Sequence, residues 1–72
     1  MKLTNGAKVV CSYKPGFGLD GWVGIVAKYR DEYVVWRAVP SETKPGEYDC
    51  IWGDYHKTLE EAKEHFFKRF KV

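Results

Sequence analysis

The stretch Trp22–Val39, WVGIVAKYRDEYVVWRAV, contains two runs of strand-forming residues on either side of a short charged turn. Runs of alternating β-branched and aromatic residues that flank a short turn are typical of a β-hairpin. With Asp31 and Glu32 as the two loop residues, Tyr29 is expected to pair with Val34. The hairpin is the element from which the rest of the fold is predicted.

This pairing divides the hairpin into two faces, because successive side chains of a strand point to opposite sides. The predicted core face contains Val23, Ile25, Ala27, Tyr29, Val34, Trp36 and Ala38. The opposite face contains Lys28, Arg30, Tyr33 and Arg37 among Val26 and Val35. We expect this second face to lie in solvent, where three positive charges beside an aromatic ring form a candidate contact surface.

Length and composition are those of a small folded domain. The chain has 72 residues, of which 44% are hydrophobic and 31% charged. At this length about 60% of the surface of the unfolded chain is buried on folding, which leaves one small core. An apolar run of about 18 residues, which a membrane span needs, is absent from the sequence, and so is a signal-peptide pattern. We therefore expect a single compact domain over residues 1–72 of a soluble, cytoplasmic protein with no membrane partner.

Two further strands are predicted around the hairpin. Residues 7–13 follow the turn dipeptide Asn5-Gly6 and alternate as a strand. One face of this strand is expected to contain Ala7, Val9, Cys11 and Tyr13. Residues 47–53 form the other strand, with Tyr48, Cys50 and Trp52 on one side and Asp49 and Ile51 on the other. Which of these two sides is buried stays open.

The loop over residues 14–21 contains three glycines and one proline, together with the large apolar residues Phe17 and Leu19. Such residues in a loop either fold back over the core as a lid or contact a partner, and the lid is the favoured interpretation.

A C-terminal helix is predicted from Leu59 to about Lys71. Thr58 and Glu61 have the spacing of a capping box, in which each side chain satisfies a backbone donor of the other residue. The apolar stripe of this helix contains Leu59, Ala62, Phe66 and Phe70, with Phe67 beside it. The predicted fold is α+β: a bent antiparallel β-sheet of about four strands with one C-terminal α-helix packed on it.

Residues 10–36 resemble the opening strands of small β-barrels of the KOW or Src-homology type. The resemblance lies in the run GWVGIV at residues 21–26, which follows a glycine-rich loop, and in YVVW at residues 33–36. Such barrels bind RNA, DNA-associated proteins or peptides, so the resemblance implies a non-catalytic binding module. The run at residues 53–62 is similar to the start of the helix in plant-type and integrase-type domains, which place a three-stranded sheet in the DNA major groove.

Residues that bind metals or act in catalysis are sparse. The four soft or imidazole ligands, Cys11, Cys50, His56 and His65, are far apart in the sequence, whereas a zinc site usually takes its ligands in close pairs. We expect no cofactor and no metal, and two buried thiols, with a disulfide as the alternative. A general base at His56, oriented by Asp54 near Asp49, is the enzymatic alternative, and non-enzymatic function is favoured.

The favoured function is protein binding, by a small accessory factor or inhibitor of a larger macromolecular machine; small phage proteins that act on host enzymes are one familiar type. The predicted partner-binding residues are Phe17, Trp22, Lys28, Arg30, Tyr33 and Arg37. Trp52 and Tyr55 are further large rings beyond the needs of one small core. The alternative is nucleic-acid binding by the outer face of the hairpin, through a local patch because the net charge is only +2. The oligomeric state is not specified by the sequence.

Overall fold

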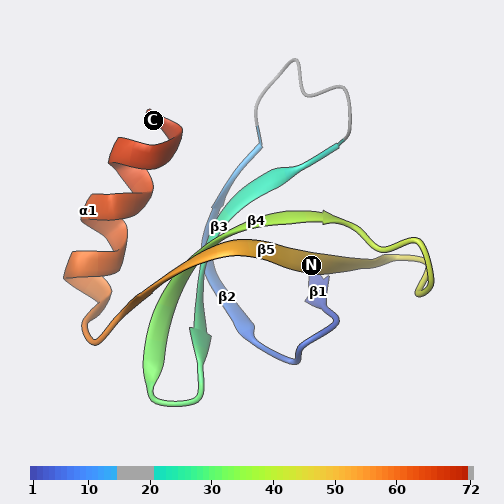
Figure 1. Ribbon diagram of the computed structural model, residues 1–72, viewed down its shortest axis with the longest axis horizontal. Helices are drawn as coiled ribbons and strands as arrows, with labels where there is room; N and C mark the ends of the chain where they lie inside the picture. The colour runs from blue at the N-terminus through green and yellow to red at the C-terminus, as the bar shows by residue number, and fades with distance from the viewer. Residues whose placement is uncertain (15–20, 72) are drawn as a thin grey trace.

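The computed structural model describes residues 1–14 and 21–71, which form a strongly curled β-sheet with one helix packed against its convex side (Figure 1). The strands are β1 (Lys2–Leu3), β2 (Lys8–Tyr13), β3 (Val23–Tyr29), β4 (Glu32–Pro40) and β5 (Glu47–His56), and the helix is α1 (Leu59–Phe70). Their order in the sheet is β1-β5-β4-β3-β2. The α+β class and the C-terminal helix are confirmed, but the sheet has five strands and is mixed, because β1 runs parallel to β5.

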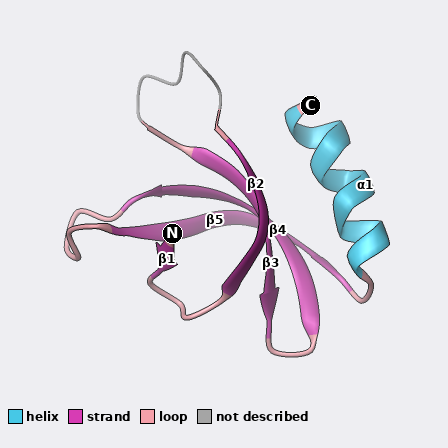
Figure 2. Cartoon of the chain, turned by 180° about the vertical axis from the view of Figure 1, so that it is seen from behind, coloured by secondary structure: helices cyan, strands magenta, loops and turns pink. Residues whose placement is uncertain are grey.

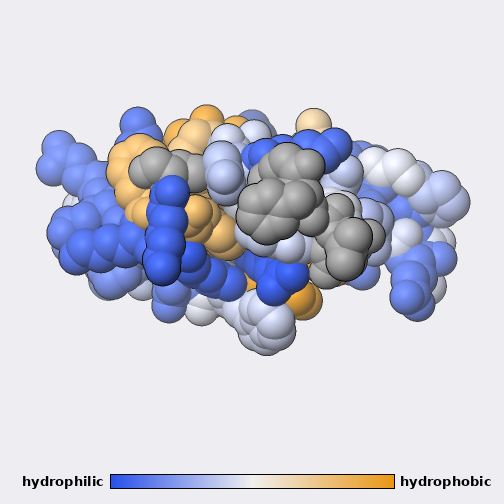
Figure 3. Space-filling model, turned by 90° about the horizontal axis from the view of Figure 1, so that it is seen from above, coloured by the Kyte–Doolittle hydropathy of each residue, from blue (hydrophilic) through white to orange (hydrophobic). Residues whose placement is uncertain are grey.

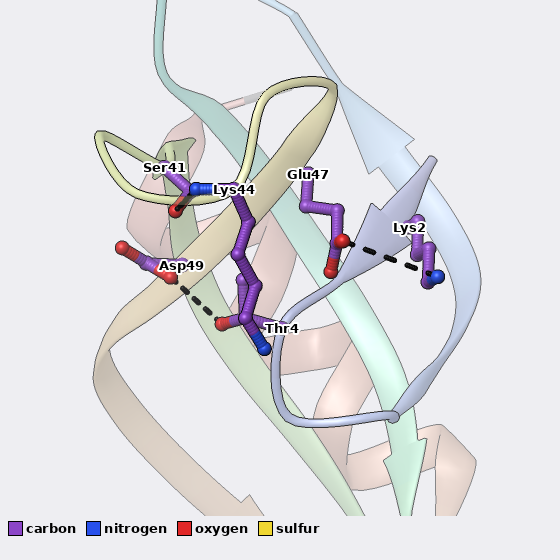
Figure 4. A network of polar contacts seen from close by, with 6 residues as sticks. All are labelled: Lys2, Thr4, Ser41, Lys44, Glu47 and Asp49. Atoms are coloured by element: carbon purple, nitrogen blue, oxygen red, sulfur yellow. Dashed lines mark hydrogen bonds and ion pairs between the residues drawn. The ribbon is translucent and has the colours of Figure 1, made fainter.

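The short β1 closes one edge of the sheet at the start of β5. Leu3 is buried beside Tyr48, and the Thr4 hydroxyl donates a hydrogen bond to Asp49 Oδ1 at 2.7 Å (Figure 4). Lys2 Nζ lies 3.9 Å from a carboxylate oxygen of Glu47. A strand of two residues has no periodicity, so the sequence pattern does not indicate it.

The register of the β3–β4 hairpin differs from the prediction by two residues. Tyr29 pairs with Glu32, which makes Arg30 and Asp31 the loop residues, and Arg30 has a φ of 57°. The observed register places Val26 opposite Val35, where the predicted one places it opposite Arg37, so side chains of like polarity meet across the strands.

A shift of two residues leaves each side chain on its predicted face, because the alternation has a period of two. The core face is therefore confirmed. It forms the concave core of the curled sheet, with buried Leu3, Val23, Ile25, Ala27, Val34, Trp36 and Ala38.

Helix α1 covers the middle of the opposite face of the hairpin, which contradicts the prediction that the whole face lies in solvent, whereas Lys28 and Arg30 are exposed as predicted. Val26 and Val35 are 0% exposed and pack against Ala62 and Phe66 of the helix. The reason is that the sheet curls, so that side chains of its own strands pack against one another on the concave side. The apolar stripe of α1 therefore has to be buried on the convex side (Figure 2).

A bulge in β2 moves residues away from their predicted face. The register shifts between Val9 and Cys11, so the intervening Val10 is an extra residue in the strand. As a result Val9 packs in the concave core, whereas Cys11 and Tyr13 pack under the helix. The prediction that these residues share one face was wrong.

A second bulge lies in β5, where Trp52 and Gly53 stand opposite the single residue Trp36 of β4. Tyr48 and Cys50 pack against the concave core, whereas Trp52 lies on the helix side beside Arg37. The prediction that Trp52 shares a side with Tyr48 and Cys50 was therefore wrong.

Helix α1 begins at Leu59 and packs as predicted. The Thr58 hydroxyl accepts a hydrogen bond from the Glu61 backbone N–H at 3.2 Å, which is the Thr58 half of the predicted capping box. The Glu61 carboxylate lies 4.0 Å from His56 Nδ1. The stripe formed by Ala62 and Phe66 is buried against the sheet. At the other end, the ring of Phe70 lies over Gly24, where a Cβ atom would approach it to 2.7 Å.

Candidate functional site

The predicted partner-binding residues lie in separate parts of the molecule. Lys28 and Tyr33 pair across the closed end of the hairpin, with Lys28 Nζ 5.7 Å from the Tyr33 ring centroid. Arg30 lies in the turn, 5.2 Å from the ring centroid of Tyr29. Helix α1 covers the strand segments between this end and Arg37, so the predicted set does not form one continuous surface. Phe17 lies outside the described residues.

Trp22 and Arg37 do come together, and a residue outside the predicted set joins them. The Arg37 guanidinium carbon lies 4.5 Å from the ring centroid of Trp22 and 5.2 Å from that of Trp52. Arg37 lies in β4 and Trp52 in β5, and Trp22 directly precedes β3. The three residues come together because β3, β4 and β5 are neighbours in the sheet. We call Trp22, Arg37 and Trp52 the Trp–Arg–Trp stack. Contacts between a guanidinium and an indole face stabilise such an arrangement by about 0.5–1 kcal/mol each at exposed sites.

Trp52 is the most exposed member of the stack. Its φ of 54° is in the left-handed region, and 65% of its surface is accessible to solvent. A bulky residue in this conformation costs of order 1–3 kcal/mol. The adjacent Gly53 fixes the position of the bulge, because a Cβ atom there would lie 2.5 Å from Trp36 Nε1.

The last turn of α1 borders the stack on the helix side. Phe70 lies 5.6 Å from Trp22 between ring centroids. Arg69 Nη1 donates hydrogen bonds to the backbone carbonyls of Val35, at 3.3 Å, and of Trp52. The same nitrogen lies 3.7 Å from Asp54 Oδ2.

The helix also exposes apolar area. Phe67 is 49% exposed, and Figure 3 shows orange, apolar atoms gathered on the side of the molecule where α1 lies.

Tyr55 is 54% exposed and packs against Trp36 on the opposite side of the sheet. The expectation that the large rings exceed what the core needs is confirmed at Trp52 and Tyr55.

The three residues of the enzymatic alternative have different partners. Asp49 accepts from Thr4, Asp54 pairs with Arg69, and His56 lies 4.0 Å from Glu61 with its ring 4.3 Å from that of His65. Within residues 1–14 and 21–71, no interaction joins Asp49, Asp54 and His56 into one site.

The structure gives no support to a metal centre in the part of the chain that it describes. No group of three or more His, Cys, Asp or Glu side chains there is arranged to hold a metal ion. Cys11 and Cys50 are free thiols, and they pack on opposite sides of the sheet. None of the helices formed by the described residues is long and apolar enough to cross a membrane.

Cys50 is a half-buried thiol with a perturbed pKa. Burial is the main cause that raises the pKa of Cys50 to about 11. The negative charge of Asp49 raises this pKa further, whereas a hydrogen bond with the Asn5 side chain lowers it. Because the thiolate is the nucleophilic form, a raised pKa makes Cys50 a poor nucleophile near neutral pH.

Sequence reasoning underestimated Trp52 and Arg69. Trp52 appeared only as a surplus ring, and Arg69 was not among the predicted partner-binding residues. The available signal was Gly53, because a glycine inside a strand pattern often marks a bulge that redirects its neighbours.

No protein-family model, curated protein or solved structure matches this chain. The resemblance of residues 10–36 to small KOW or Src-homology barrels therefore stays a prediction.

Proposed function

We propose that this protein is a non-enzymatic binding protein that contacts a protein partner through the Trp–Arg–Trp stack. The observation that supports the proposal most strongly is Trp52, which is exposed although it adopts a strained backbone conformation. Strain of this kind is typically found where function requires it. Trp and Arg are also the residue types most enriched among those that dominate binding energy at protein interfaces. In this proposal the protein occupies the surface of a larger macromolecule, as an inhibitor or accessory factor.

Nucleic-acid binding is the alternative, and the charges near the candidate surfaces favour it less. Asp54 lies beside Arg69 near the stack, and Asp31 and Glu32 adjoin Arg30 at the hairpin turn. Phosphate contacts depend on unopposed positive charge, which these carboxylates reduce.

Affinity purification of the tagged protein from a lysate of the cells that make it separates the two functions. We expect the same protein partner to be retained with and without nuclease treatment. A partner that is lost after nuclease treatment would instead indicate a nucleic-acid bridge and contradict the proposal.

Charge reversals locate the surface within the same experiment. Arg37→Glu removes the cation at the centre of the stack and is expected to abolish retention of the partner. Arg30→Glu is the matched control, because Arg30 lies at the far end of the hairpin, and it is expected to retain the partner. Loss of the partner with Arg30→Glu but not with Arg37→Glu would place the contact at the hairpin turn.

A further inference from the structure

The Trp–Arg–Trp stack and the last turn of α1 form one closed ring of contacts. Arg69 donates to the carbonyl of Trp52, and Trp52 stacks on Arg37. Arg37 stacks in turn on Trp22, which contacts Phe70, the residue next to Arg69 in the helix. Two adjacent helical residues thus contact the two tryptophans whose rings lie next to the guanidinium.

We infer that Arg69 is a positioning residue of the candidate binding site, which fixes Trp52 in the stack through the bulge of β5. The inference rests on the proposed function in so far as it assigns the stack to partner binding. It adds a residue and an element, the last turn of α1, to that site.

The chemistry of the contact explains why an arginine occupies this position. A bulge disrupts the strand ladder locally, and carbonyls near it need another donor. The Nη1 nitrogen of Arg69 has two hydrogens. It donates to the carbonyl of Val35 in β4 and to that of the bulged residue Trp52 in β5, so it joins the two strands at the bulge. The carboxylate of Asp54, 3.7 Å away, attracts the Arg69 guanidinium and helps to hold it in place. The Arg69 side chain is only 22% exposed. A lysine offers one compact ammonium group and does not reproduce this planar geometry.

Spectroscopy of Arg37 tests the inference without a partner. The guanidinium lies over two indole rings, whose ring currents shift its side-chain NMR signals upfield, so the position of these signals reports whether both contacts are made. Arg69→Met keeps the aliphatic length and the helix propensity but removes the donors. We expect the Arg37 signals of this variant to move part of the way toward those of an unstacked arginine, because Trp22, the nearer ring, keeps its contact with Phe70. The far-UV circular dichroism is expected to stay unchanged.

The matched control is Lys68→Met in the same helical turn. Lys68 is exposed and pairs with Glu64, at 3.3 Å, and not with the sheet, so its substitution is expected to leave the Arg37 signals in place. If Arg69→Met does not fold, Asp54→Asn weakens the same contact, and we expect a smaller movement of the Arg37 signals in the same direction.

The two levels of the proposal fail in different ways. Arg37 signals that do not move in a folded Arg69→Met protein, or in Asp54→Asn where that variant replaces it, would overturn the positioning role. Signals that move while the variant still retains the protein partner would leave the positioning role intact and overturn the assignment of the stack as the binding surface. Movement together with loss of the partner supports both.

Discussion

At the scale of single residues, Trp52 is in a conformation that the fold does not require of a tryptophan. A left-handed φ suits Asn or Gly better, and an indole that is 65% exposed contributes little burial. Its ring lies 5.2 Å from the Arg37 guanidinium carbon. The proposed binding role gives this conformation a reason that burial does not supply.

Replacing Trp52 by Asn is expected to change stability little. The substitution relieves strain of about 1 kcal/mol or more and removes a cation–π contact of about 0.5–1 kcal/mol. We expect the free energy of unfolding, measured by urea denaturation, to stay within about 1 kcal/mol of the wild type. A loss of several kcal/mol would show that Trp52 is a structural residue.

The Cys50 thiol gives stability a specific dependence on pH. Its pKa in the folded protein, about 11, is above the ordinary value of 9.0, so the folded state binds the proton more tightly than the unfolded state. The stabilisation is present below pH 9.0 and is lost as the pH rises from 9.0 toward about 11.

Urea midpoints measured across this pH range test the effect, with Cys50→Ala as the reference. We expect the wild type to lose more stability than Cys50→Ala between the two pH limits. Parallel pH profiles for the two proteins would contradict the raised pKa.

At the scale of elements, the docking of α1 depends on a close approach to β3. A Cβ atom at position 24 would lie 2.7 Å from the Phe70 ring. Either the ring of Phe70 or the backbone of β3 would have to shift to make room for it. We expect Gly24→Ala to reduce the free energy of unfolding by about 1–3 kcal/mol, as overpacking commonly does.

A double-mutant cycle with Phe70→Leu assigns this cost to the contact. The smaller side chain at position 70 leaves room for the added methyl group, so Gly24→Ala is expected to cost less in the Phe70→Leu background. Equal costs in the two backgrounds would mean that the clash lies elsewhere.

The elements that the sequence predicted well are those specified by local chemistry. The start of α1 follows from the Thr58 cap, and its buried stripe follows from helical spacing. The core face of the hairpin is robust because an error of two residues in register leaves every side chain on the same side.

The candidate site was harder to predict because it depends on contacts between distant segments. Arg37 was identified from the alternation of side chains in the predicted hairpin, and Trp22 as a ring that could extend the same face. The bulge that brings Trp52 beside them depends on the pairing of β5 with β4. The two residues of β1 have no pattern of their own. The covering of the outer face by α1 follows from the curl of the whole sheet, which no single stretch of sequence specifies.

At the scale of the whole molecule, the helix and the curled sheet meet at the stack. The helix separates the hairpin end, where Lys28 and Tyr33 lie, from the end with Trp22 and Arg37. The proposed binding surface therefore lies at one end of the convex side and does not extend over the full outer face of the hairpin.

The most direct test of this account is the amount of protein partner that Trp52→Asn retains in nuclease-treated affinity purification, relative to the wild type. Because the substitution is expected to preserve the fold, the account predicts that the folded variant loses the partner. Retention of the partner at the wild-type level by folded Trp52→Asn would contradict it.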